Sequence, residues 1–350
     1  MLTVGSSFQL SEAFSSSARP TAPKGSQSQQ QPVGNVLILD HVNINHEKGR
    51  HDWLRSFYFD FLKCSVDPRK EDNLKKGSKT LWANIGAQQL HLPEGTSSAQ
   101  VLKGKITLAY PNFEGLEQRF QQAQEALQGS QFCMVKQDGS MSVMDPWGNP
   151  FCFVVGDHFR DERGSQPRGD ESEGLGMCDV TIHVAKGSNM AGIGRFYSQI
   201  FGAPILDVNT DSCCLSVGPH QTLTFVAVDQ TEVLHHDLRE EPQEDDKPIF
   251  YSNYGPHVSM YVSDLTSTYK KANDLGVAYV NPRFRRRAYS LQEALDQCTF
   301  RCLDIVDPEH VDEGPILQLE HEIRSVVKPD GSKYKSCPFH DIPDSCVVNK

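Results

Sequence analysis

Four segments of similar pattern recur along this chain, and each opens with a short apolar strand. The four openings are 38–43 (ILDHVN), 105–110 (KITLAY), 178–184 (CDVTIHV) and 257–262 (HVSMYV). A helix and further strands are predicted after each opening. Such repetition limits the possible folds, because one unit cannot bury its apolar face alone and must pack against its copies. We therefore expect a fold of four packed modules.

The two halves of the chain also match each other in detail. Residues 55–58 (RSFY) correspond to 194–197 (GRFY), and helices are predicted at 113–127 in one half and 265–275 in the other. Each half then reaches an Asp-Pro dipeptide, at Asp145-Pro146 and Asp307-Pro308. Asp-Pro followed by Gly or Asn indicates a turn. A strand is expected after each turn, at 151–155 and 316–320.

These motifs resemble the vicinal oxygen chelate superfamily, which includes glyoxalase I, extradiol dioxygenases and bleomycin-resistance proteins. The similar region runs from about residue 35 to residue 324. The resemblance implies an α+β fold of four βαβββ modules, arranged as two tandem glyoxalase-like domains with curved mixed sheets. It does not identify a reaction, because one fold supports many chemistries.

Changes in composition suggest the domain boundaries. A Ser- and Gln-rich leader is followed by two domains, a polar linker and a tail, and an acidic stretch interrupts the second domain. The predicted segments are the leader 1–34, domain one 35–156, the linker 157–176, domain two 177–324 with the insertion 229–247, and the tail 325–350. The leader fits either a disordered segment or an organelle transit peptide. The cytoplasm is therefore the expected location, with a plastid or other organelle as the alternative.

Charge and hydropathy exclude several classes of partner. The net charge of −11 argues against nucleic-acid binding, which calls for a basic face. No apolar run is long enough to predict a membrane span. The ten cysteines show no zinc-ribbon spacing and are expected to be reduced, although a disulfide between Cys337 and Cys346 is conceivable. We expect a small-molecule substrate and, because two domains are fused, a monomer.

The resemblance further implies a metal in a cup formed by two modules, with ligands on the first and last strand of each. Strand parity decides which side chains can face such a cup. Module one offers His41 and His91, and module four offers His257 and Glu320. The other two modules offer Lys105, Cys152, Asp179, and Leu223 or Thr224.

The pairing of the modules decides whether these ligands meet. If module one pairs with module four, one cup holds His41, His91, His257 and Glu320, and the other cup lacks a complete ligand set. Fused glyoxalase I proteins show this crossed pairing, by resemblance. If neighbours pair instead, Asp179 or His183 joins His257 and Glu320 in a set typical of non-haem Fe(II) dioxygenases.

Three imidazoles and one carboxylate suit a divalent ion such as Zn, Ni, Fe(II) or Mn. By resemblance to glyoxalase I, Glu320 is the candidate catalytic residue, as a ligand that also acts as general base. Arg287, from a basic cluster at 283–287, and Arg301 are the candidates for binding a substrate anion. The cluster could equally be a solvated loop that faces the acidic insertion.

Three functions remain open at this point. The first is a metal-dependent lyase or isomerase that resembles glyoxalase I and acts on a small α-oxo or thiohemiacetal-like substrate through a metal-stabilised enediolate. The second is a non-haem Fe(II) dioxygenase of extradiol type. The third is a metal-free binding or structural protein on the same fold.

Overall fold

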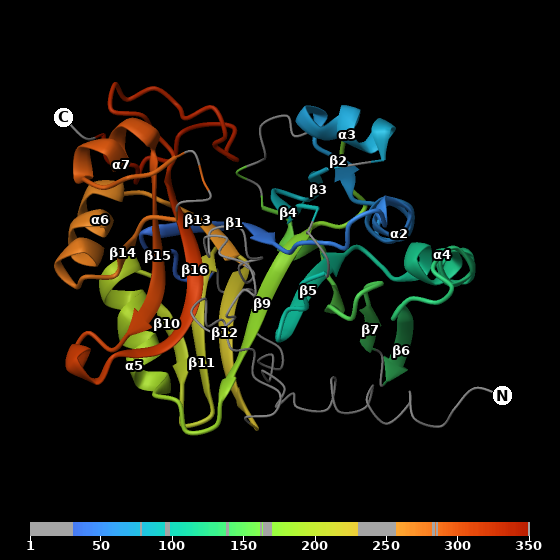
Figure 1. Cartoon of the computed structure of the whole chain (residues 1–350), viewed down its shortest axis with the longest axis horizontal. Helices are drawn as coiled ribbons and strands as arrows, with labels where there is room; N and C mark the ends of the chain where they lie inside the picture. Colours follow the sequence, from blue (N-terminus) through green and yellow to red (C-terminus); the bar gives the residue numbers. More distant parts are fainter. Residues whose placement is uncertain are drawn as a thin grey trace, which may run out of the picture.

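Two curved sheets of eight strands each form the centre of the α+β fold (Figure 1). The computed structural model describes residues 31–77, 79–94, 99–137, 140–161, 163, 170–229, 257–281, 284 and 286–348. The leader and the acidic insertion, apart from 31–34 and Asp229, lie outside these residues, as do Arg283 and Arg285. The sheets are mixed, and four modules of βαβββ type supply their strands.

The first sheet combines modules one and four in the order β14-β15-β16-β13-β1-β4-β3-β2. Its strands are β1 (Val36–Asn43), β2 (Ser65–Val66), β3 (Leu81–Ile85), β4 (Gln88–Leu92), β13 (His257–Val262), β14 (Ala278–Tyr279), β15 (Thr299–Val306) and β16 (Pro315–Ser325). The two opening strands, β1 and β13, pair antiparallel at its middle. The last strands, β4 and β16, flank them in parallel.

The second sheet combines modules two and three in the order β10-β11-β12-β9-β5-β8-β7-β6. Its strands are β5 (Gly104–Tyr110), β6 (Cys133–Gln137), β7 (Ser140–Met144), β8 (Pro150–Val155), β9 (Gly176–Ala185), β10 (Ile205–Val208), β11 (Ser212–Gly218) and β12 (Gln221–Val228). Again the two opening strands, β5 and β9, pair antiparallel in the middle. The strand orders confirm the crossed pairing of modules, and they exclude the sequential pairing.

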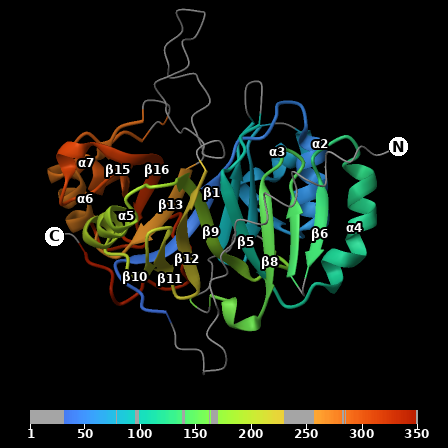
Figure 2. The same cartoon turned by 90° about the horizontal axis from the view of Figure 1, so that it is seen from below.

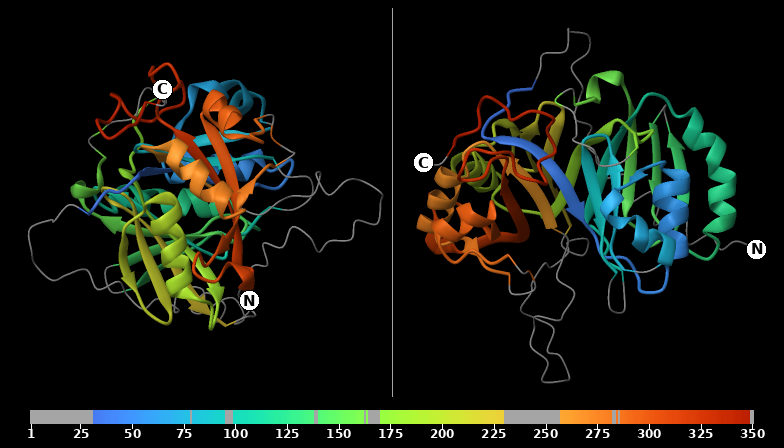
Figure 3. Two further views of the ribbon diagram at one scale, coloured as in Figure 1. Left: turned by 90° about the vertical axis from the view of Figure 1, so that its left-hand side faces the viewer. Right: turned by 90° about the horizontal axis from the view of Figure 1, so that it is seen from above.

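Helices cover the outer faces of the sheets (Figure 2). One side carries α2 (His51–Leu54), α3 (Glu71–Lys76) and α4 (Glu114–Ala126), and the other carries α5 (Met190–Phe196), α6 (Leu265–Asp274) and α7 (Leu291–Gln297). β1 crosses between the two sides (Figure 3). No helix in the described part of the chain is long and apolar enough to cross a bilayer.

Local sequence explains why helices form at the predicted places. The predicted helices at 113–127 and 265–275 are observed as α4 and α6. Asp264 starts α6 by accepting a hydrogen bond from the Ser267 backbone N–H, as an N-cap residue does. A wide π-helical turn occurs at each of the two matching Phe-Tyr segments: η1 (Arg55–Phe61) contains the first, and η4 (Tyr197–Phe201) begins at the tyrosine of the second. The internal repeat is therefore a repeat of structure as well as of sequence.

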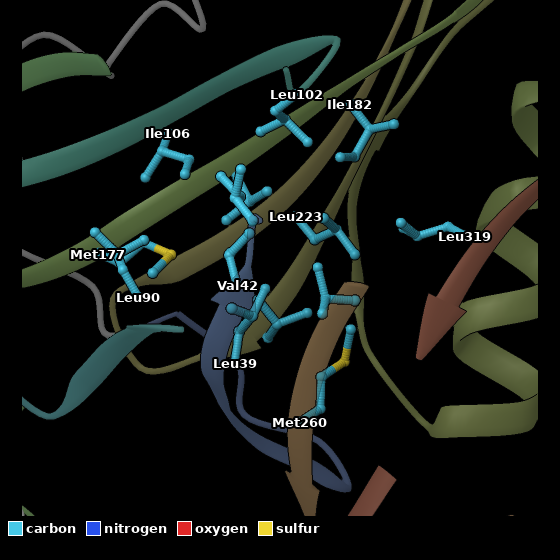
Figure 4. Close-up of a cluster of buried hydrophobic side chains, with 14 of the residues drawn as sticks. Leu39, Val42, Leu90, Leu102, Ile106, Met177, Ile182, Leu223, Met260 and Leu319 are labelled. Atoms are coloured by element: carbon cyan, nitrogen blue, oxygen red, sulfur yellow. The ribbon is translucent and has the colours of Figure 1, made fainter. Parts of the chain in front are cut away.

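A continuous apolar core joins the two sheets. Leu39 and Val42 of β1 lie in the same cluster as Ile106 of β5, Leu223 of β12 and Met260 of β13 (Figure 4). Leu39, Val42, Ile106 and Leu223 are each at most 1% exposed. Since residues of all four modules meet here, each sheet depends on the other for burial of its inner face.

Candidate metal centre

A cavity of about 600 Å³ lies against the first sheet, where modules one and four meet. Its wall is built from polar, basic and aromatic side chains, with few aliphatic ones. It includes Asn43, Arg69, Lys70, Trp82, Gln89, His91, His257, Asn281, Phe284, Arg286, Arg287, Arg301, Glu322, Arg324 and Lys335. We call this cavity the first cup.

Three buried side chains, His41, His257 and Glu322, converge where β1, β13 and β16 lie side by side, and His257 and Glu322 of this group line the first cup. Their ligand atoms all lie within 4.8 Å of one another. Oε2 of Glu322 is 3.7 Å from Nε2 of His41 and 3.9 Å from Nε2 of His257. Two ligands of one first-row ion, each at about 2.1 Å, lie roughly 3–3.5 Å apart. Small side-chain rotations would therefore bring all three onto one ion.

Strand register produces this convergence. His41 pairs across the β1–β13 ladder with Ser259, and Ser259 pairs in turn with Glu322 of β16. The small Ser259 between them leaves room for the imidazole and the carboxylate to approach. β1 has an irregularity in its register between Leu39 and His41. Bulges of this kind re-aim side chains.

Asp40 orients the imidazole of His41. Its Oδ2 lies 2.9 Å from Nδ1 of His41, so the neutral ring that donates there presents the lone pair of Nε2 toward Glu322 and His257. Nε2 is buried and has no hydrogen-bond partner among the described residues. Burial lowers the pKa of His41 and outweighs the opposing effect of Asp40. A neutral, oriented imidazole with an unpaired buried nitrogen is what a divalent ion requires of a histidine ligand.

Two arginines hold Glu322 in its charged form. Arg324 approaches Oε1 with Nε at 2.9 Å and Nη2 at 2.8 Å, and Nη2 of Arg301 lies 3.2 Å from Oε2. Burial alone would raise the pKa of Glu322, but Arg324 and Arg301 outweigh it and lower the pKa well below its usual range. The cup therefore contains a fixed carboxylate beside two imidazoles.

Two of the four predicted ligands, Glu320 and His91, lie outside this group. Both oxygens of Glu320 are 2.9 Å from the side-chain amide nitrogen of Asn281, and Oε1 also accepts from Nη1 of Arg301 at 2.5 Å. The ring of His91 stacks on that of His41, with centroids 3.6 Å apart, and its Nε2 lies 3.1 Å from Oε1 of Gln89. The structure thus brings together His41, His257 and Glu322, and sets Glu320 and His91 beside them.

The predicted anion-binding residues both line the first cup. Arg301 lies 3.6 Å from the ring centroid of Phe284 and bridges Glu320 and Glu322. Arg287 is exposed at the rim and donates from Nε to the Phe284 carbonyl. Among the described residues that line the cavity, there are five arginines and two lysines but one carboxylate, that of Glu322. This excess of positive charge suits an anionic ligand.

The corresponding place in the second sheet is arranged differently, and we call it the second cup. Asp179 accepts hydrogen bonds there from the hydroxyls of Thr181, Thr222 and Thr224. Cys152 accepts instead from Ser142. His183 lies on β9 in this second sheet, so it cannot join His257 and Glu320. Cys337 and Cys346 do not form a disulfide with each other.

Sequence reasoning missed Glu322, Asp40 and Arg324. Alternation along a strand places Glu322 on the same face as Glu320, so parity permitted either residue. An acidic residue directly before a candidate ligand, as Asp40 precedes His41, was a further signal. The contribution of Arg324 depends on packing, because nothing local indicates which carboxylate an arginine meets.

Comparison with known proteins gives similarity in structure only. No family model and no curated protein matches the sequence. Among solved structures, glyoxalase I from Zea mays is 12% identical with a TM-score of 0.46, covering 83% of this chain and 93% of its own. A provisionally assigned dioxygenase from Bacillus subtilis subsp. subtilis str. 168 is 12% identical with a TM-score of 0.47, covering 84% and 86%. The cppA protein from Streptococcus pneumoniae TIGR4 is 10% identical with a TM-score of 0.45, covering 84% and 100%.

Proposed function

We propose that the first cup binds one divalent first-row metal ion through His41, His257 and Glu322, and that it converts a small anionic substrate there. The convergence of two Nε2 atoms on Oε2 of Glu322, at 3.7 and 3.9 Å, carries this proposal. When bound, such an ion supplies a Lewis acid and, if it is iron, a redox centre.

The surrounding residues fit this role. Asp40 fixes the ring of His41, and Arg324 occupies Oε1 of Glu322, so Oε2 is the oxygen that faces the imidazoles. Arg301 spans Glu320 and Glu322 at the cavity wall. A carboxylate or phenolate of the substrate would compete for this guanidinium and be held beside the metal ligands.

The ligand set favours an Fe(II)-dependent dioxygenase acting on a catechol-type anion. Two histidines and one carboxylate leave open coordination positions, and this set is typical of non-haem Fe(II) oxygenases. Glu320, the predicted general base, already has both oxygens bound by Asn281 and Arg301. An enediolate route would require that carboxylate to be freed.

A glyoxalase-like lyase or isomerase is the second candidate, and the bridging position of Arg301 is the observation that favours it. If a substrate anion draws Arg301 away, Glu320 keeps, of its partners in the described chain, the side-chain amide of Asn281. It could then accept a proton from the carbon next to a carbonyl group.

Metal content and oxygen uptake test the proposal together. The full wild-type chain is reconstituted with Fe(II) without air, and we expect it to retain one equivalent of iron. The variants His41→Ala and His257→Ala should each lose this equivalent. His183→Ala is the matched control, because His183 lies on the opening strand β9 of the other sheet. It should leave this equivalent in place.

Turnover then separates the reactions. Oxygen uptake with a panel of catechols supports the dioxygenase, and isomerisation of a hemithioacetal without oxygen uptake supports the second candidate. If His41→Ala and His257→Ala bind as much metal as the wild type, or if the wild type binds none, the proposed centre is wrong. The metal-free binding protein then becomes the better hypothesis.

A further inference from the structure

A second group of metal-binding side chains lies beyond the ends of β1 and β4. It consists of His46, His51 and Glu94, whose ligand atoms all lie within 4.8 Å of one another. His46 and Glu94 face each other through an isolated parallel bridge that extends the β1–β4 pairing. His51 is the first residue of α2. None of the three lines the first cup.

The two imidazoles are buried without full hydrogen bonding. His46 is 1% exposed and His51 is 6% exposed. Within the described chain, no hydrogen bond of good geometry reaches either ring nitrogen of His46 or Nδ1 of His51. The backbone of Leu92 and Pro93 interacts with the His46 ring without meeting that geometry. Leaving a buried polar group unsatisfied costs free energy comparable to a lost hydrogen bond. An ion between the three side chains would satisfy these nitrogens.

Hydrogen bonds to the backbone orient the side chains of His51 and Glu94 through the atoms that would not bind the ion. Nε2 of His51 lies 2.7 Å from the Lys79 carbonyl, to which it donates, so Nδ1 carries the lone pair. Metal-binding histidines commonly donate their second N–H to a backbone carbonyl in this way. Oε1 of Glu94 accepts from the Gly49 backbone N–H at 3.3 Å, which leaves Oε2 for a ligand.

We propose that His46, His51 and Glu94 bind a second divalent ion, and that this ion is Zn²⁺. Two imidazole nitrogens and one carboxylate oxygen are donors that Zn²⁺ accepts in four-coordinate sites, with water in the fourth position. His46 lies in the connection between β1 and α2, His51 is the first residue of α2, and Glu94 lies just beyond β4. The ion therefore ties that connection to the sheet and has a structural role.

Zinc stoichiometry on the full chain tests this site. The chain is stripped with a chelator, titrated with Zn²⁺ against a chromophoric competitor, and counted by mass spectrometry. His46→Gln should remove one equivalent, or raise its Kd by about 100-fold or more, since loss of a ligand exceeds the loss of a supporting contact. His41→Ala should leave this equivalent in place. Failure of the metal site proposed in the first cup can therefore be distinguished from failure of this second site.

A second variant and an optical signal keep the test decisive if His46→Gln folds poorly. Glu94→Gln changes a partly exposed side chain and should lose the same equivalent with unchanged circular dichroism. The ring centroid of Trp147 lies 5.9 Å from that of His46, so Co²⁺ in this site should quench its fluorescence. The site does not exist if both variants retain the wild-type zinc stoichiometry. It does not exist either if the wild type binds no zinc.

Discussion

The two cups share one backbone plan and hold different chemistry. His41 faces Ser259 across the centre of the first sheet as Lys105 faces Thr181 across the second. Equivalent pairings place His257 opposite Asn43, and Asp179 opposite Thr107. On the last strands, Glu322 pairs with Ser259, and Thr224 pairs with Thr181. Glu322 and Thr224 therefore occupy equivalent positions in the two sheets. Two imidazoles and a carboxylate in one cup are therefore replaced by an amine, a carboxylate and a hydroxyl in the other.

The difference shows how the partner of a buried carboxylate decides its chemistry. Burial raises the pKa of Asp179, and the three threonine hydroxyls only partly offset this effect. Burial also acts on Glu322, but Arg324 and Arg301 reverse it and lower the pKa. Only the first cup therefore combines a fixed negative charge with two imidazoles, which is the combination that suits a metal.

The largest test of this comparison removes the arginine that holds Glu322. Arg324→Met leaves a buried carboxylate without its main partner, so we expect a loss of about 3–5 kcal/mol in the free energy of unfolding. Urea denaturation measures the loss. Lys105→Met, which removes the cation of the second cup, should cost less than about 1 kcal/mol. Equal losses in the two variants would show that the arginine has no special role.

A smaller effect is expected from the second cup. Thr222→Val removes one of the hydroxyls that donate to Asp179, and a lost hydrogen bond to a charged group of this kind costs about 1–2 kcal/mol. Thr222→Ser keeps the hydroxyl and is the matched control. Chemical denaturation of both variants near pH 7 gives the values. The account of Asp179 fails if the valine variant is as stable as the serine variant.

The same contrast recurs at the two Asp-Pro turns, where we expect the smallest effect. Hydrogen bonds from Arg195 are the main cause of the low pKa of Asp307. Asp145 accepts hydrogen bonds from neutral donors such as Tyr58 and Asn149, and burial raises its pKa. A lowered pKa stabilises the fold above the usual value of 3.8. That contribution is lost as the pH falls below this value.

Asp307→Asn should therefore lower the free energy of unfolding by about 1 kcal/mol at pH 7. The variant should also lose less stability than the wild type when the pH falls below 4, by about the same amount. Urea unfolding between pH 7 and pH 3 measures both quantities. Asp145→Asn is the control with the opposite sign, because protonation of Asp145 in acid relieves the cost of burying its charge. If the two variants have parallel pH profiles, the distinction between charged and neutral partners is wrong.

Much of the fold could be predicted because its signals are local and repeated. All four opening strands are observed near their predicted bounds, as β1, β5, β9 and β13. The crossed pairing was also predictable, because only that pairing collects the donor residues of modules one and four in one cup. The domain boundaries, with the bounds of the acidic insertion, remain predictions.

The candidate site could be predicted only in part, and the choice between Glu320 and Glu322 shows why. Both lie on β16 at positions of equal parity, so the sequence permits either as a ligand. Register places Glu320 opposite His257 and Glu322 opposite Ser259, in the row that also contains His41. Asn281 and Arg301 then bind Glu320.

The sequence by itself determined the four modules and their strands, and it identified two histidines, His41 and His257, on opening strands of modules that must meet. Periodicity and turn residues act over a few positions, so they can be read directly from the chain. The tertiary structure decided which carboxylate joins these histidines and that His46, His51 and Glu94 lie together. Those outcomes depend on register, on a bulge and on the packing of residues far apart in the chain, which local patterns do not encode.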